Sequence, residues 1–362
     1  MKRIGLVLAV LAGLAVVLFG GLRLFAPAIG ERVFARQVEI RLGRDRRSEL
    51  PDGLHAAFCG TGSPLPDPTR AQSCIAVIAG EWVFIVDSGS GSTANLLLMG
   101  LPAGAIEAVF LTHFHSDHLS DLGDLGLQRW IGGAHETPLP VHGPDGVSGV
   151  VDGFNTAYAR DAVYRTGHHG TAIAPLSGHG LEARPFALPA SGGAVTLIEA
   201  DGLQVRAVAV DHDPAAPAVA YRFDYGGRSL VISGDLAMPR SPGFADLARS
   251  ADLLIVEALQ PRLLAHITDT ARARDLPDLA TITTDILDYH TTPEEAADAA
   301  AAAGAQALVL THIVPAVPAQ IVEPAFLGEA RARFDGLLEI ARDGDAVLLP
   351  AGKQDVEVRE WR

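Results

Sequence analysis

Residues 109–122, VFLTHFHSDHLSDL, place three histidines and two aspartates within nine positions, directly after an apolar run. Four of these residues lie within six positions: His113, His115, Asp117 and His118. Such a cluster, buried without compensation, would cost several kcal/mol. Neutral imidazoles and carboxylates are natural metal ligands, and adjacent pairs can face two different ions. The spacing therefore predicts a metal site on a turn that follows a strand.

Further candidate ligands follow apolar β runs elsewhere in the chain. His212 comes after VRAVAVD, Asp235 after RSLVISG, and His312 ends ALVLTH. Loops at strand ends supply the functional residues of many α/β scaffolds. An aspartate is the ligand best suited to bridge two cations, so these positions favour a site for two metal ions.

The composition indicates a folded, acidic protein. Hydrophobic residues make up 48% of its 362 residues, which is ample for a sizeable core. The formal net charge of −15 repels polyanions and argues against a nucleic-acid partner. The sequence leaves a homodimer open.

The N-terminus has a different character from the rest. Residues 4–22 carry no charge and would span about 28 Å as a helix, close to the thickness of a bilayer core. A signal peptide usually has a shorter apolar core and a clean cleavage site, whereas the site at residues 26–28 contains a proline. We expect an N-terminal transmembrane anchor over residues 1–28, with a removed signal peptide as the alternative. The catalytic domain is then expected outside the cytoplasm, in the periplasm or an equivalent compartment.

Residues 29–50 are rich in arginine and predict an amphipathic stalk that lies on lipid headgroups. A solvated helical linker fits the same residues equally well. The folded domain is expected over residues 51–362.

Within that domain, short β runs alternate with helical patterns. Residues 73–79 and 82–86 read as strands, and residues 218–233 read as a hairpin that turns on two glycines. Residues 292–304, TPEEAADAAAAAG, predict a helix with a threonine cap, acidic residues in the first turn and a glycine stop. The pattern predicts one α/β domain with mixed sheets covered by helices.

The motif His-x-His-x-Asp-His, followed by isolated His, Asp and His after later strands, resembles the metallo-β-lactamase superfamily over residues 54 to about 350. The resemblance implies a four-layered αββα sandwich with a dinuclear site. Zinc is the metal it implies, with manganese or iron also open. It assigns His113, His115 and His212 to one ion, Asp117, His118 and His312 to the other, and Asp235 to both. It also gives Asp87, in the motif VDSG, the role of supporting the ligand loop.

Two segments, CGTGSPLPDPTRAQSC and LPVHGPDG, look like the branch of that superfamily that contains tRNA 3′ endonucleases, arylsulfatases and phosphodiesterases. Residues 153–170 are most similar to the arylsulfatase-like members. An arm that binds tRNA would be basic, whereas residues 152–193 are not. We therefore rank sulfate or phosphate ester hydrolysis first, with a small-molecule ester as the expected substrate. A tRNA 3′-processing endoribonuclease and a lactonase or β-lactamase are the alternatives. A non-enzymatic metal-binding interaction protein is disfavoured, because all seven ligand positions are filled.

The metals suggest a mechanism in which a shared water is deprotonated and attacks the ester. Asp117 would bind one metal and hold that water. His290, oriented by Glu257, is the candidate acid for the leaving oxygen. The alternative for His290 is a surface histidine at a helix cap.

Other residues have weaker claims. His168 and His169 are candidates for contacts with substrate, although a solvated loop explains them as well. Cys59 and Cys74 are the only cysteines; they could pair in an oxidising compartment or remain two buried thiols.

Overall fold

The computed structural model describes residues 2–361, although before Phe25 it describes only some of the side chains. The chain divides into two compact units, Met1–Asp45 and Arg46–Arg362. The second unit therefore begins at Arg46 rather than at residue 51.

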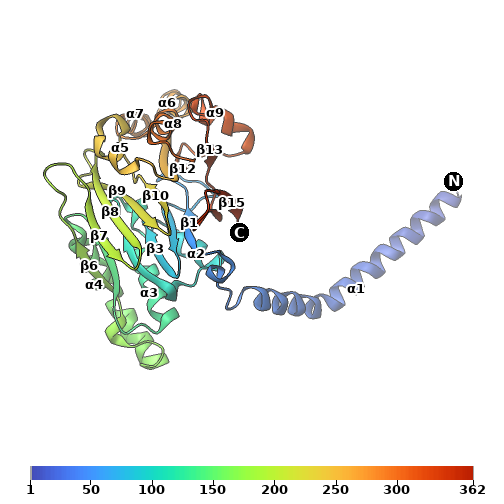
Figure 1. The fold of residues 1–362 in the computed structure, drawn as a ribbon. Coiled ribbons are helices and arrows are strands. Elements are labelled where there is room, and N and C mark those ends of the chain that lie inside the picture. Colours follow the sequence, from blue (N-terminus) through green and yellow to red (C-terminus); the bar gives the residue numbers. More distant parts are fainter. Residues whose placement is uncertain (1, 362) are drawn as a thin grey trace. The chain divides into compact units, whose positions relative to one another are not determined.

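The first unit contains one helix, α1 (Lys2–Arg41), which continues through the boundary expected at residue 28 (Figure 1). Every residue from Phe25 to Leu42 is exposed. The amphipathic stalk expected over residues 29–50 stays a prediction.

The expected membrane span over residues 4–22 falls largely on side chains outside the described residues. Among the described residues, no helix is both long and apolar enough to cross a membrane. The predicted transmembrane helix therefore has no support from the structure, and a location outside the cytoplasm stays a prediction.

In the second unit, the described residues form two sheets. The first has the strand order β15-β14-β1-β2-β3-β4-β5-β6, and the second has the order β13-β12-β11-β10-β9-β8-β7. The strands of the first sheet are β1 (Gly53–Gly60), β2 (Cys74–Ala79), β3 (Trp82–Val86), β4 (Ile106–Phe110), β5 (Leu139–Gly143), β6 (Leu181–Pro185), β14 (Asp345–Pro350) and β15 (Glu357–Glu360). Those of the second are β7 (Val195–Ala200), β8 (Leu203–Val210), β9 (Ala218–Tyr225), β10 (Arg228–Ile232), β11 (Leu253–Leu259), β12 (Ala307–Val314) and β13 (Leu337–Ile340).

Helices cover the outer face of each sheet (Figure 1). Those that pack on the first sheet are α2 (Ser92–Leu98), α3 (Leu122–Gly133) and α4 (Val147–His169). The helices in the second half are α5 (Pro242–Ala248), α6 (Pro261–Ala273), α7 (Pro277–Asp285), α8 (Pro293–Ala303), α9 (Glu323–Leu327) and α10 (Ala330–Arg333).

Three apolar cores hold these layers together. Between the sheets, Phe58 and Phe110 of the first sheet meet Tyr221 and Phe223 of the second. A second core joins α2, α3 and α4 to the first sheet, and a third joins α5 and α8 to the second. Each large side chain buried in this way stabilises the fold by about 1.5–3 kcal/mol. The four-layered αββα sandwich is therefore confirmed.

The local signals read from the sequence are also confirmed. In α8, Thr292 accepts a hydrogen bond from the Glu295 amide, the Glu295 carboxylate accepts one from the Thr292 amide, and Gly304 ends the helix at φ 70°. Strands β9 and β10 form the expected hairpin, with Gly226 and Gly227 at positive φ.

Parallel strands set the geometry of the site. Strands β3 to β6 run parallel to one another in the first sheet, as do β10 to β13 in the second. Their carboxyl ends lie at one edge of the sandwich, because the amide of Val219 at the start of β9 bonds to the carbonyl of Thr112 just after β4. Loops from both sheets therefore meet at this edge.

Cys59 and Cys74 form a disulfide between β1 and β2, with their α-carbons 5.1 Å apart. The bond closes a loop between Cys59 and Cys74. This loop lies at the edge where the parallel strands end, because the Ile313 amide of β12 bonds to the carbonyl of Thr61. Asp343, from outside the loop, also holds it, since its carboxylate accepts hydrogen bonds from Thr61 and from the Ala71 amide. Of the two alternatives that the sequence left open for these cysteines, the structure therefore has the pair.

Replacing both cysteines by alanine should lower the free energy of unfolding by about 2–4 kcal/mol, because the bond closes a loop of 15 residues. Urea unfolding of the variant and the wild type, each with and without a dithiol reductant, measures this. The reductant should bring the wild type down to the level of the variant. Equal stability of the two proteins without reductant would contradict a formed bond.

Candidate metal centre

The seven expected ligands come from loops and one strand at the shared edge of the two sheets. His113, His115, Asp117 and His118 follow β4, His212 follows β8, Asp235 follows β10, and His312 lies in β12. Apart from His115, which is exposed, these side chains are buried. The exposed imidazole leaves the centre open to solvent on one side.

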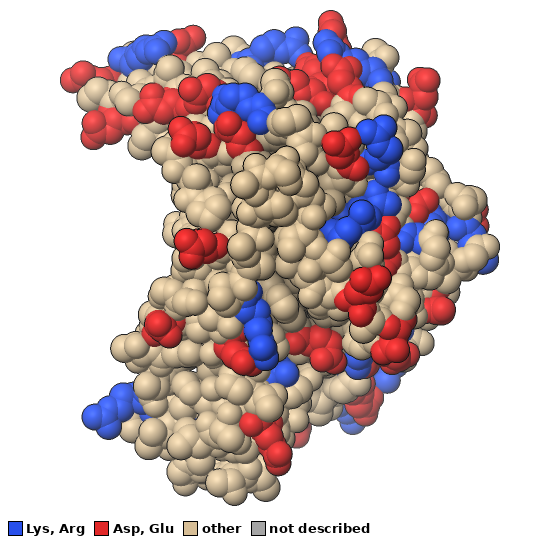
Figure 2. All heavy atoms as spheres, turned by 60° about the vertical axis from the view of Figure 1, so that its left-hand side comes forward, with Lys and Arg blue, Asp and Glu red and all other residues tan. Residues whose placement is uncertain are grey.

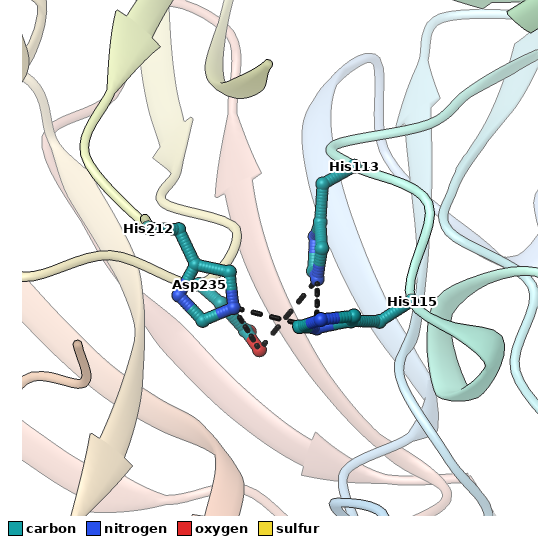
Figure 3. A group of neighbouring side chains, drawn as sticks. All are labelled: His113, His115, His212 and Asp235. Carbon is teal, nitrogen blue, oxygen red and sulfur yellow. Dashed lines mark hydrogen bonds and ion pairs between the residues drawn. The ribbon is translucent and has the colours of Figure 1, made fainter. Parts of the chain in front are cut away.

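One group of four brings together His113, His115, His212 and Asp235, whose ligand atoms lie within 4.8 Å of one another (Figure 3). The His115 Nδ1 atom is 2.9 Å from His113 Nε2 and 3.4 Å from His212 Nε2. The Asp235 Oδ2 atom is 4.0 Å from His113 Nε2 and 3.8 Å from His212 Nε2.

The second group contains Asp117, His118 and His312. Asp117 Oδ2 is 3.4 Å from His118 Nε2 and 3.1 Å from His312 Nε2. Asp235 Oδ2 is also close to these imidazoles, 3.3 Å from His118 Nε2 and 3.4 Å from His312 Nε2. The same carboxylate oxygen thus faces both groups.

These separations fit zinc. Two ligands bound at about 2.0–2.1 Å in a tetrahedron stand about 3.3 Å apart. The distances in the second group, 3.1 and 3.4 Å, are close to this value. Those in the first group run from 2.9 to 4.0 Å and so lie on both sides of it. The buried Nε2 atom of His118 and Oδ1 atom of Asp235 have no hydrogen-bond partner among the described residues. Donor atoms left bare in this way, in a set of imidazoles and carboxylates, suit two zinc ions.

Neighbouring groups orient two of the imidazoles, those of His113 and His118, so that Nε2 points toward the other ligands. His118 donates from Nδ1 to Asp87 at 2.7 Å, and His113 donates from Nδ1 to the Thr112 hydroxyl at 3.1 Å. Asp87 also accepts from the amide and hydroxyl of Thr112, at 2.8 Å each. Partners of this kind set the tautomer and orientation of metal-binding histidines.

Charge in the centre is balanced within the ligand set. Burial favours the neutral form of Asp235, but His312 and His118 hold the pKa of its carboxyl well below its ordinary value. Burial, together with neighbouring imidazoles, lowers the pKa of His113 well below its ordinary value. Burial opposes a charge on His118, but Asp235 and Asp87 raise its pKa well above its ordinary value. Without a metal, a protonated imidazole thus balances the buried carboxylates, and a bound divalent cation would take over that role as the proton leaves.

Glu257 and His290 form a pair at the rim of the centre. The Glu257 carboxylate, at the end of β11, accepts from His290 Nδ1 at 3.0 Å and from the Thr291 amide at 2.9 Å. Burial opposes a charge on His290, but Glu257 raises its pKa to about 9. The His290 ring is 5.7 Å from that of His312, and its side chain is only 7% exposed. It is therefore not the surface cap of α8, a position that Thr292 occupies.

Tyr289 is a contact that the sequence analysis missed. Its carbonyl accepts from His212 Nδ1 at 2.9 Å, and its ring is 5.1 Å from that of His212. The only signal was its place next to His290 in the chain.

His168 and His169 do not lie at the centre. Both are exposed at the carboxyl end of α4, and neither belongs to a metal-binding group of the described residues. The helix has 23 residues and so carries them about 33 Å from its first turn, which follows the β5 end of the site edge. Their expected contact with substrate has no support here.

The sequence of this chain is similar to those of known proteins. The Beta-lactamase superfamily domain matches residues 84–313. Ribonuclease Z of Mycobacterium marinum is 36% identical over 292 residues, which cover 80% of this chain and 96% of that protein. Ribonuclease Z of Mycobacterium avium is 35% identical over 300 residues, covering 82% and 99%.

Solved structures share the fold. The short form of human tRNase Z matches with a TM-score of 0.56 and 24% identity, covering 82% of this chain and 99% of that one. The metallo-beta-lactamase fold protein YhfI from Bacillus subtilis matches with a TM-score of 0.55 and 23% identity, covering 81% and 98%.

These relatives overturn two expectations from the sequence. The ranking of an arylsulfatase-like or phosphodiesterase-like hydrolase of small esters above a tRNA 3′-processing endoribonuclease is wrong, since the relatives are ribonucleases. The exclusion of a nucleic-acid partner is wrong for the same reason. Net charge sums the whole surface, whereas a metal-dependent nuclease meets its substrate at the metal centre, where the cations supply the positive charge.

Purified wild-type protein should hold close to two equivalents of zinc per chain, because the candidate ligand atoms form two sets that share Asp235. The D235A variant should lose at least one equivalent. The H290A variant should keep two, because Glu257 already engages His290 Nδ1, although His290 also forms a group with Asp235 and His312 whose ligand atoms lie within 4.8 Å of one another. Mass-spectrometric metal analysis after dialysis measures this. Only trace zinc in folded, zinc-reconstituted wild type would contradict the dinuclear assignment.

Proposed function

Since this chain belongs to the metallo-β-lactamase superfamily and, within it, to the ribonuclease Z family, we propose that it hydrolyses RNA phosphodiesters at a dinuclear zinc centre. The chain is a metal-dependent hydrolase. The substrate class to which its relatives point is tRNA with a 3′ extension. The single observation that carries the proposal is the Asp235 oxygen, which faces both groups of ligands at 3.3–4.0 Å.

The seven ligands would hold the zinc ions as two sets: His113, His115 and His212 in one, Asp117, His118 and His312 in the other, and Asp235 in both. When bound, the two ions supply Lewis-acid chemistry that activates water and neutralises the charge of a phosphodiester. Asp117 belongs to the second set and faces Asp235 across the centre, so its carboxylate would accept a hydrogen bond from the attacking water.

His290 and Glu257 would serve the leaving group. Because Glu257 holds His290 at Nδ1, the opposite ring nitrogen, Nε2, is left to donate toward the centre. A ribose oxygen is a poor leaving group and needs a proton as the P–O bond breaks. The raised pKa keeps His290 protonated at neutral pH in the absence of metal, and nearby cations would lower that pKa toward the working range.

The distribution of surface charge bears on how RNA would be held. On the face drawn in Figure 2, Lys and Arg side chains are interspersed with Asp and Glu and form no continuous basic stripe. Together with the net charge of −15, this favours few phosphate contacts. Recognition would then depend on the metal centre and on contacts to the sugar and base.

The zinc-loaded protein should cleave a 3′-extended tRNA transcript and leave an aryl sulfate intact. Gel analysis of the RNA, with a dye-release assay for the sulfate, measures both activities. The D117A variant should lose cleavage, because it removes a ligand and the group that orients water. Turnover of the sulfate without RNA cleavage would contradict the proposal.

The H290A variant should keep its zinc and lose about 10²–10⁴-fold in rate on RNA, as expected for removal of a general acid. An aryl phosphodiester, whose leaving group needs little protonation, should lose much less. Single-turnover rates on the two substrates make the comparison, with E257Q as the variant that weakens the support of His290. An equal loss on both substrates would show that His290 does not donate the proton.

A further inference from the structure

A hollow of about 640 Å³ lies at the same edge of the sandwich as the metal ligands, beyond the ends of β5 and β6. Its lining is formed by Asp145, Pro185, Phe186, Ala187, Leu188 and Pro217. Apart from Asp145, these side chains are apolar. The size and character are those of a small-molecule site, which combines apolar walls with a few polar groups.

Backbone hydrogen bonds fix the walls of this hollow to the metal-binding loop. The Phe186 amide bonds to the carbonyl of Gly143 at 3.1 Å, at the end of β5. One residue earlier, the carbonyl of His142 accepts from the Leu111 amide at 2.9 Å. Leu111 is two positions before the ligand His113, so the Phe186 wall is anchored beside the centre.

The opposite wall is anchored in the same way. Pro217 is two positions before Val219, whose amide bonds to the carbonyl of Thr112 at 2.9 Å. On the other side, Pro217 follows the ligand His212 by five positions. The hollow therefore opens between two segments that both lead to metal ligands.

Phe186 has the environment of a stacking residue. It is half-buried, and its ring meets that of the fully buried Tyr221 edge to face, with centroids 6.4 Å apart. The Tyr221 hydroxyl in turn donates to the carbonyl of Leu111 at 2.6 Å. The ring is thus held against the core on one side and lines the hollow on the other. Asp145 is exposed at the rim, where its carboxylate can accept hydrogen bonds.

We propose that this hollow binds a nucleobase of the substrate next to the scissile phosphodiester. The inference rests on the proposed function and adds a base site to it. Phe186 stacks on the base, an interaction that tolerates any base because each has a π-face. Asp145 accepts from the exocyclic amino group of a base such as cytosine, as carboxylates do in nucleic-acid recognition.

The test compares the F186L variant with the wild type on two RNAs, one intact and one abasic at the nucleotide beside the cleavage site. Leucine keeps an apolar contact with the core but removes the aromatic face. F186L should lower kcat/KM on the intact RNA by about 5–150-fold and change it little on the abasic RNA. Y164L, at an exposed aromatic on α4, is the matched control and should behave as wild type on both.

A binding measurement separates the inference from the proposed function. By calorimetry on the zinc-loaded protein, cytidine monophosphate should bind at least fivefold more tightly than ribose 5-phosphate. F186L should abolish this difference, and D145A should remove a preference for cytidine over uridine monophosphate. These results would support the base site even if no RNA were cleaved, an outcome that would overturn only the proposed function.

The opposite pattern would overturn the base site alone. RNA cleavage that F186L leaves unchanged, together with equal binding of cytidine monophosphate and ribose 5-phosphate, would show that the hollow holds no base. Zinc content of each variant, measured in parallel, confirms that any loss arises outside the metal centre.

Discussion

The buried carboxylate of Asp235 is the constraint on which the rest of the structure depends. Its Oδ2 atom lies 3.3–4.0 Å from the Nε2 atoms of four histidines. Burying an ionised carboxylate is costly unless opposite charge or hydrogen bonds surround it. The histidines come from loops of both sheets, so the two sheets must end at one edge and stay in register. The inter-sheet core is therefore a condition for the chemistry.

The backbone around this carboxylate shows how tightly the sheets approach. Gly234 has φ 59°, and a β-carbon there would lie 2.8 Å from the Thr112 β-carbon and 3.0 Å from the Val219 carbonyl oxygen. Asp87 and His312 adopt positive φ as well, at 61° and 47°, although neither is glycine. Such conformations cost about 1–3 kcal/mol each and persist where surrounding contacts enforce them. Here the hydrogen bonds that Asp87 makes to Thr112 and His118 do so.

The net negative charge of this chain is compatible with ribonuclease relatives, because net charge and the charge at the active site act differently. Whole-chain charge governs long-range attraction of a polyanion, while catalysis depends on the few groups that touch the scissile bond. A nuclease with few basic contacts must obtain affinity elsewhere. The metal centre and the apolar hollow beside Phe186 are the two features at this edge that can supply it.

The sequence by itself determined the local features. The apolar runs that end in His or Asp predicted the strand ends of the site. The residues of α8 predicted its cap and its glycine stop, and the motif from His113 to His118 predicted the metal chemistry. Each of these signals lies within one short segment. The family resemblance added that Glu257 would orient His290 and that Asp117 would share an ion with His312, and the structure brings these pairs together across 33 and 195 positions. Only the tertiary structure decided the contacts that neither a motif nor the resemblance supplied. The Cys59–Cys74 bond, the remote place of His168 and the walls of the hollow likewise depend on strand register and helix direction, which no local pattern encodes.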